Sequence, residues 1–306
     1  MEKQTNNYGN NKTPVSSREG GFLYSFLVIS IIFVSLFYSI IVTVAFKGDL
    51  SLNANTVLIL NYLTGPIAIT IAIGILRYKV KRDLITPLLQ KKFNKNAIVP
   101  TVLICFGLVF GLSEVNSYFV LMLENLGLQI STPALPSYSL GNVFLVVIIV
   151  CVLPSIVEEF AFRGIILSGL ENAGKPFAIL LSGVLFSLFH MSPAQTVYQF
   201  IVGVVYALIV LKGGNVVFTM ILHFANNLFI VLNYYYFNLN FEGAVKIVII
   251  LLALISLAIG VLLLIKNDQP TETVQNQEKS LDKKIFLLAS VAGILASGCM
   301  WLAGLL

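Results

Sequence analysis

Residues 141–170 read GNVFLVVIIVCVLPSIVEEFAFRGIILSGL, an apolar run interrupted by two adjacent carboxylates and an arginine. The run is longer than the roughly 20 apolar residues that a helix needs to cross the hydrocarbon core of a membrane. Ionisable side chains are costly in that environment, and they normally mark ion pathways, proton relays or catalysis. This stretch therefore predicts a membrane-spanning helix that carries a functional site.

The composition of the whole chain indicates a membrane protein. Hydrophobic residues make up 58% and charged residues 11% of the 306 residues, whereas a soluble globular chain has about 25% charged residues. Polar connectors separate long apolar runs, a pattern of helices rather than of the short alternating strands of a membrane barrel. We therefore expect an all-α, polytopic membrane helix bundle with eight or nine transmembrane helices, the expected spans being 21–46, 56–76, 98–123, 141–170, 176–191, 195–211, 215–236, 244–265 and 285–306.

The polar and apolar stretches divide the chain into four parts. Residues 1–20 are polar and predict a disordered tail, and residues 21–123 hold the first three spans. Residues 140–235 form the expected helical core that carries the ionisable groups. Residues 244–306 hold the last two spans, with a polar linker at 266–284.

The distribution of lysine and arginine predicts the topology. The loop after the second span is crowded with basic residues, and the positive-inside bias assigns such a loop to the cytoplasm. Nine alternating spans then put the N-terminus in the cytoplasm, and of the 19 lysines and arginines only Lys47 and Lys246 fall outside. We expect a multi-pass protein of the cell membrane. The basic residues lie in loops between apolar runs, so they report topology and give no indication of a nucleic-acid partner.

The two carboxylates of the acidic motif are expected to point in different directions. Glu158 and Glu159 are helix neighbours, so their side chains diverge by about 100°. Glu159 and Arg163 are four residues apart on one face, where an ion pair can form. Glu158 stays free for a second partner, an arrangement that suits a general base beside an orienting group. The alternative is an ion pair that only locks two helices together.

The chain has two histidines, and both lie in apolar spans downstream of the glutamates. His190 follows Phe186 by four residues, and His223 and Asn227 are four apart on one helical face. Counting the helical rise from the span ends places Glu158 and both histidines at compatible depths. We expect one cluster inside the bilayer that is reached from its cytoplasmic half.

Two further polar residues in the spans have open interpretations. Asn226 is offset from His223 by three residues, and it can bond a neighbouring helix. Glu114 lies in the third span near Asn116, where it either lines the same cavity or pairs with a neighbour.

The motifs EExxxR at Glu158, Glu159 and Arg163, FxxxH at Phe186 and His190, and HxxxN at His223 and Asn227 occur in that order. In this they resemble the CPBP group of intramembrane endopeptidases, the CAAX-protease and bacteriocin-processing family, also called Abi. The resemblance covers about residues 140–235. It implies a hydrolase of peptide bonds whose site lies in the membrane.

The resemblance also implies roles for the motif residues. Glu158 with His190 would activate the attacking water, and His223 with Asn227 would stabilise the oxyanion of the tetrahedral intermediate. Glu159 and Arg163 would orient the site. Members of the family are described both as metalloproteases and as metal-free glutamate proteases. We expect no cofactor, and if a metal such as Zn²⁺ binds, its ligands would be Glu158, His190 and His223.

The expected partners are membrane lipids and a membrane-associated peptide or protein substrate. The Asn-, Lys- and Ile-rich composition is typical of bacterial proteins, for which prenylated CAAX substrates are not expected. Maturation of a peptide, or self-immunity against a bacteriocin, is the favoured role. Two alternatives remain, a catalytically idle immunity or scaffold protein and a proton-coupled transporter that uses the same buried groups as a relay.

Overall fold

The structure, a computed structural model, describes residues 15–45, 54–81, 83–84, 86–89, 94–131, 134–266 and 276–305. Helices account for all regular secondary structure in these ranges. Eight helical segments are long and apolar enough to cross a membrane, and a ninth apolar helix is shorter. The all-α, polytopic membrane fold expected from the sequence is confirmed.

The helical segments agree with the expected spans to within a few residues at most ends. Four of the long segments consist of several consecutive elements, because the backbone changes its hydrogen-bonding pattern along them. The long segments are α1 (Ser17–Ala45), α2 (Ala54–Val80), Lys95–Asn125 with α4 (Ile98–Gly107) and α5 (Ser113–Asn125), Leu140–Glu171 with α6 (Leu140–Val146), α7 (Leu153–Glu159) and α8 (Leu167–Glu171), Pro193–Gly213 with α10 (Thr196–Gly213), Val217–Phe237 with α11 (Val217–Leu232), α12 (Gly243–Lys266) and α13 (Asn276–Ala303). The shorter apolar helix is α9 (Lys175–Phe189), and α3 (Thr86–Leu89) is a single turn.

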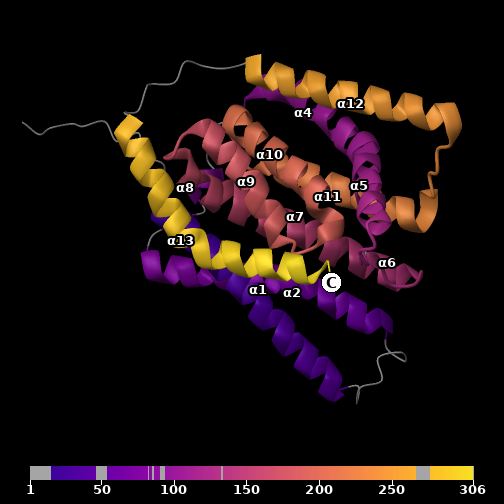
Figure 1. Cartoon of the computed structure of the whole chain (residues 1–306), viewed down its shortest axis with the longest axis horizontal. Coiled ribbons are helices and arrows are strands. Elements are labelled where there is room, and N and C mark those ends of the chain that lie inside the picture. The colour runs from indigo at the N-terminus through magenta and orange to yellow at the C-terminus, as the bar shows by residue number, and fades with distance from the viewer. Residues whose placement is uncertain are drawn as a thin grey trace, which may run out of the picture.

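The helices that carry the motifs lie in the middle of the molecule. Figure 1 shows α7, α9, α10 and α11 between two outer groups, with α12 and α4 along one edge and α1, α2 and α13 along the other. The outer helices expose many large apolar side chains, as a surface in contact with lipid does. The motif residues are therefore shielded from lipid by other helices.

Two expected boundaries are corrected by the structure. α1 begins at Ser17, so residues 17–20 are helical and do not belong to the expected tail, of which residues 1–14 lie outside the described ranges. The cause is a capping box, in which the Ser16 N–H donates to the Glu19 carboxylate (2.8 Å) and the Glu19 N–H donates to the Ser16 hydroxyl (3.3 Å). α13 likewise begins at Asn276, inside the expected linker, and residues 267–275 are outside the described ranges.

Connections that the expected topology places on one side of the membrane touch one another. The Asn94 N–H donates to the Gly213 carbonyl (2.9 Å), and the Asn172 side chain donates to the Val15 carbonyl (3.1 Å). These contacts join the starts of α1 and α4 to the ends of α8 and α10. We call the side of the molecule on which these two pairs of helix ends lie the basic end.

The connections expected on the other side also meet. The Tyr62 hydroxyl donates to the Ala134 carbonyl and the Tyr235 hydroxyl donates to the Pro136 carbonyl, each over 2.7 Å. We call this side the opposite end. Its described lysine, Lys246, forms an ion pair with Glu114 (2.7 Å), so Glu114 pairs with a neighbour as one of its two interpretations predicted.

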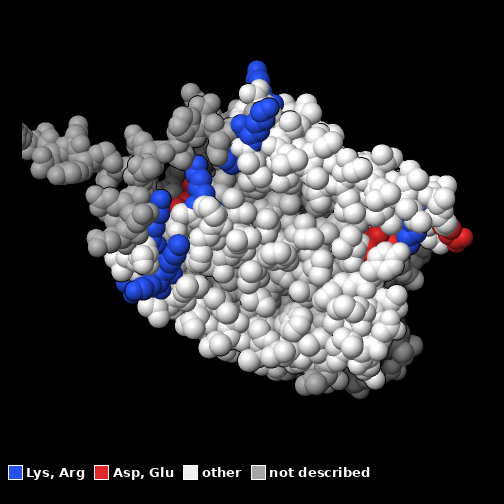
Figure 2. All heavy atoms as spheres, turned by 45° about the horizontal axis from the view of Figure 1, so that its top comes forward, with Lys and Arg blue, Asp and Glu red and all other residues white. Residues whose placement is uncertain are grey.

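Figure 2 shows lysine and arginine gathered toward one side of the molecule, while a smaller group of both signs lies at the other. This separation agrees with the expected alternation of sides, in which α9 and α10 together leave the basic end and return to it. Which side faces the cytoplasm stays a prediction from the positive-inside bias.

Close packing of α9 against α10 depends on two glycines. A Cβ atom on Gly203 would lie 2.7 Å from the Gly183 Cα and 3.2 Å from its carbonyl oxygen. A backbone atom cannot give way as the tip of a flexible side chain can. The two helices therefore approach each other closely only with glycine at this crossing.

We expect Gly203→Ala to lower the free energy of unfolding by about 1–3 kcal/mol, the usual cost of overpacking. The matched control is Gly74→Ala, because a Cβ there meets no atom within 4 Å and alanine favours a helix over glycine by about 1 kcal/mol. Thermal unfolding in detergent measures both. Equal Tm values for the two variants would contradict the proposed close approach.

Candidate active site

The motif residues come together from three helical segments. Glu158 and Glu159 end α7, and Arg163 lies one turn later, in a widened π turn over Phe160–Ile166. In that turn the Leu167 N–H donates five residues back, to the Phe162 carbonyl. Such π turns occur frequently at functional sites. His190 caps the end of α9, and α11 supplies His223 and Asn227.

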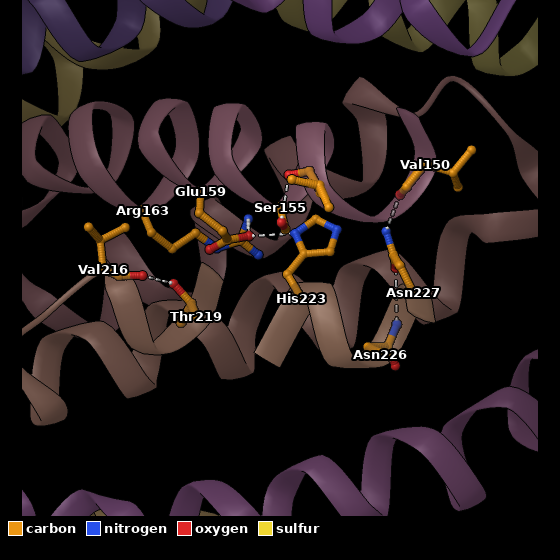
Figure 3. A network of polar contacts seen from close by, with 10 residues as sticks. Val150, Ser155, Glu159, Arg163, Val216, Thr219, His223, Asn226 and Asn227 are labelled. Carbon is orange, nitrogen blue, oxygen red and sulfur yellow. Dashed lines mark hydrogen bonds and ion pairs between the residues drawn. The ribbon is translucent and has the colours of Figure 1, made fainter. Parts of the chain in front are cut away.

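Glu159 is the centre of a buried ionic cluster. Its Oε1 atom lies 3.1 Å from the Arg163 guanidinium and 3.0 Å from Nδ1 of His223 (Figure 3). The side chains of Glu159 and Arg163 are fully buried. The ion pair expected from the four-residue spacing is therefore present, and it extends to a third residue, on α11, that the spacing did not indicate.

Aromatic rings surround the arginine. The guanidinium carbon of Arg163 lies 4.0 Å from the centroid of the Phe186 ring and 5.2 Å from that of Tyr206. The electron-rich faces of such rings stabilise a cation, more strongly where water is excluded. Within the described chain, Arg163 forms no further hydrogen bond. Rings of α9 and α10 thus complete the surroundings of the charge that Glu159 balances.

Glu158 has different surroundings from its neighbour. It lines a cavity of about 590 Å³ that both histidines and Asn227 also line, whereas Glu159 and Arg163 do not. Its Oε2 atom is buried and has no hydrogen-bond partner among the described residues. The divergence of the two carboxylates is as predicted: Glu159 faces the arginine and Glu158 faces the cavity.

A hydrogen bond to the backbone determines which nitrogen of the His190 ring carries the hydrogen. Its Nδ1 lies 2.8 Å from the Phe186 carbonyl oxygen. Because a carbonyl only accepts, Nδ1 carries the hydrogen, and in the neutral ring Nε2 has the lone pair. The spacing of Phe186 and His190 therefore has two uses: the Phe186 carbonyl orients the imidazole, and its ring covers Arg163.

A chain of polar contacts runs along the cavity wall beside Asn227. The Asn227 amide donates to the Val150 carbonyl (2.9 Å) and accepts from Asn226 (3.4 Å), and Asn226 in turn accepts from the Tyr198 hydroxyl (2.6 Å). Figure 3 shows Asn227 between Val150 and Asn226. Asn226 thus bonds a neighbouring helix, as expected. The chain of contacts holds the Asn227 side chain in one orientation.

Two tyrosines are among the cavity residues that the sequence analysis did not indicate. Tyr198 and Tyr206 lie in an apolar span, and no spacing motif singles them out. The sequence feature that could have indicated them is a tyrosine hydroxyl inside a membrane span, because a buried hydroxyl needs a polar partner.

The expected zinc ligands are not gathered into a metal-binding group in the described ranges. No group of three or more His, Cys, Asp and Glu side chains in these ranges is arranged to hold a metal ion. This includes Glu158, His190 and His223, the ligands expected for a zinc ion.

These observations define a polytopic helical membrane protein with a buried glutamate–histidine site. Residues 140–229 match the family Rce1-like, described as type II CAAX prenyl endopeptidase Rce1-like. The match confirms the family assignment drawn from the three motifs, over the part of the chain that carries them, and it supports a CAAX-type intramembrane protease at the level of the family. Comparisons with curated proteins and with solved structures found no significant match.

We expect Arg163→Met to lower the free energy of unfolding by about 3–5 kcal/mol, since the change leaves the buried Glu159 carboxylate without its cation. The double variant Glu159→Gln/Arg163→Met should lose less, because it buries no uncompensated charge. Thermal unfolding of the single and double variants forms a double-mutant cycle. Lys246→Met, in the partly exposed pair with Glu114, is the control and should change the Tm little. Additive losses for Glu159 and Arg163 would contradict the coupling.

Proposed function

We propose that the chain is an intramembrane endopeptidase in which Glu158 activates the attacking water. The observation that carries this proposal is the different commitment of the two glutamates. Glu159 is held by Arg163 and His223, while Glu158 lines the cavity with an unpartnered carboxylate oxygen in the described chain. An acceptor that has no other bond can take a proton from a bound water molecule.

The hydrolysis has two steps. The water oxygen forms a bond to the carbonyl carbon of the scissile peptide, and the proton it loses passes to Glu158. The tetrahedral intermediate then breaks its C–N bond, and the proton passes to the leaving nitrogen. His190 assists as a second acceptor through Nε2, because its Nδ1 is occupied by the Phe186 carbonyl.

His223 and Asn227 are the proposed oxyanion donors. His223 has its Nδ1 anchored on Glu159, and an imidazole with a hydrogen on both ring nitrogens would offer the Nε2–H to a developing negative charge. Asn227 has two amide hydrogens, of which one goes to Val150, and the second is available to the oxyanion. Both donors are held before substrate binds, which is the condition for effective stabilisation of a transition state.

The proposed substrate is a membrane-associated peptide or protein segment, processed in peptide maturation or in self-immunity. The family comparison supports a protease of CAAX type, and the exposed apolar surface of the outer helices supports contact with lipids. The proposed location is the cell membrane, with a cytoplasmic N-terminus.

We expect Glu158→Gln to lower the rate of cleavage of a membrane-anchored, internally quenched peptide by about 10²–10⁴-fold, the usual contribution of a general base. Glu114→Gln is the matched control, since this glutamate pairs with Lys246 and does not line the cavity. It should cleave at the rate of the unmodified protein. The measurement is fluorescence release by purified protein in detergent or liposomes.

Other results with the Glu158→Gln variant, or with a chelator, would support different functions. Undiminished cleavage by Glu158→Gln would remove Glu158 from the mechanism. Complementation of a deletion strain by the same variant would support the immunity or scaffold alternative. Inhibition by a chelator that Zn²⁺ reverses would support a metal bound by Glu158, His190 and His223.

We expect Asn227→Ala to lower kcat by about 10²–10³-fold with little change in KM, because an oxyanion donor acts mainly in the transition state. Asn125→Ala is the control, as Asn125 is exposed at the end of α5 and does not line the cavity. A rise in KM at constant kcat would instead assign Asn227 to substrate binding.

A further inference from the structure

The cavity extends from the proposed catalytic groups toward one end of the molecule. Besides Glu158 and the histidines, it is lined by Tyr62, Leu135 and Tyr234. These residues lie at the opposite end, where the Tyr62 hydroxyl bonds the Ala134 carbonyl. Tyr234 is 60% exposed, so the cavity reaches the surface there.

Toward the basic end the site is closed. Glu159 and Arg163 lie next to Glu158 in the chain on that side, and both are buried to within 1%. Phe162 and Phe186 pack there edge to face, with ring centroids 5.0 Å apart, and neither has exposed surface. None of the described cavity-lining residues belongs to the connections at the basic end.

The walls of the cavity match a polypeptide rather than an anion. Apart from Glu158 and the histidines, the described residues that line it carry no formal charge. Polar uncharged side chains such as Asn61, Gln195 and Gln199 line it together with tyrosines. Amides pair with the N–H and C=O groups of an extended backbone, and a cavity of about 590 Å³ lies within the usual range of binding pockets, about 300–1,000 Å³.

Since the positive-inside bias assigns the basic end to the cytoplasm, we propose that substrate reaches the site from the extracytoplasmic side of the membrane. The substrate is an extended, uncharged segment of an exported peptide or of the extracytoplasmic part of a membrane protein. This reverses the cytoplasmic access expected from helical depth. The identity of the substrate as a peptide rests on the proposed function, whereas the side of access does not.

Cysteine labelling tests the side of access without any activity. Cys105, Cys151 and Cys299 are replaced by alanine, and single cysteines are introduced as Gln199→Cys in the cavity and Tyr234→Cys at its rim. The control is Lys266→Cys, exposed at the basic end of α12. A membrane-impermeant maleimide is applied to intact cells and then to permeabilised cells.

We expect Gln199→Cys and Tyr234→Cys to be labelled in intact cells, and Lys266→Cys only after permeabilisation. Labelling of Lys266→Cys in intact cells would overturn the proposed orientation. Labelling of Gln199→Cys only after permeabilisation would overturn extracytoplasmic access. Labelling of Tyr234→Cys from outside while Gln199→Cys reacts under neither condition would show a closed cavity, which also contradicts the proposal.

A second measurement separates this inference from the proposed function. In liposomes, an internally quenched peptide added outside should be cleaved in proportion to the molecules whose Lys266→Cys is protected from a label added outside. Cleavage that follows Lys266→Cys labelling instead would overturn the side of access while the peptidase assignment stands. Absence of cleavage in both orientations, with the labelling pattern as expected, would overturn the peptidase assignment alone.

Discussion

The rest of the site depends on one carboxylate oxygen of Glu159, which contacts both the Arg163 guanidinium and the His223 imidazole. Oε1 of Glu159 holds Arg163 at 3.1 Å and Nδ1 of His223 at 3.0 Å, in surroundings that exclude water. Isolated, each of these groups would be expensive to bury, and only their mutual pairing makes the cluster tolerable. The same contact joins α7 to α11. It also turns the imidazole of His223 so that its other nitrogen lies on the far edge of the ring.

A consequence for the neighbouring carboxylate follows from helix geometry. Because successive side chains diverge on a helix, a Glu159 that faces the arginine requires a Glu158 that faces elsewhere, here the cavity. One glutamate therefore stabilises the ionic cluster and the other faces the cavity. Two glutamates that are adjacent in the sequence can therefore have different surroundings, because their side chains leave the helix in different directions.

Much of the fold was predictable because long apolar runs leave few alternatives to membrane helices. The two wrong boundaries have local causes. The spacing of Ser16 and Glu19 signals a helix start in the sequence, yet the apolar run that predicts this span begins only at Gly21. Where a polar segment such as 276–284 continues an apolar helix, hydropathy alone cannot find the helix start.

The candidate site was predictable only within single helices. Glu159 and Arg163 share a helix, so their spacing indicated their contact. Glu159 and His223 are 64 residues apart, and the rotation of one helix against another is not encoded in either span alone. The sequence therefore paired His223 with Asn227 by face and missed its bond to Glu159. Tyr206, which covers Arg163 from α10, lay outside every motif.

The shortness of α9 has a consequence for hydration. Its 15 residues extend about 22 Å, less than the roughly 30 Å of a hydrocarbon core, so the helix stops before it has crossed. The carbonyl groups of its last turn then end inside the membrane, where lipid cannot bond them. One of them binds the His190 ring and another the His190 N–H, and backbone that is irregular at this depth is tolerated where it is buried in protein or lines a water-filled space. The early end of α9 thus leaves polar backbone beside the cavity that His190 lines, in surroundings that water can enter.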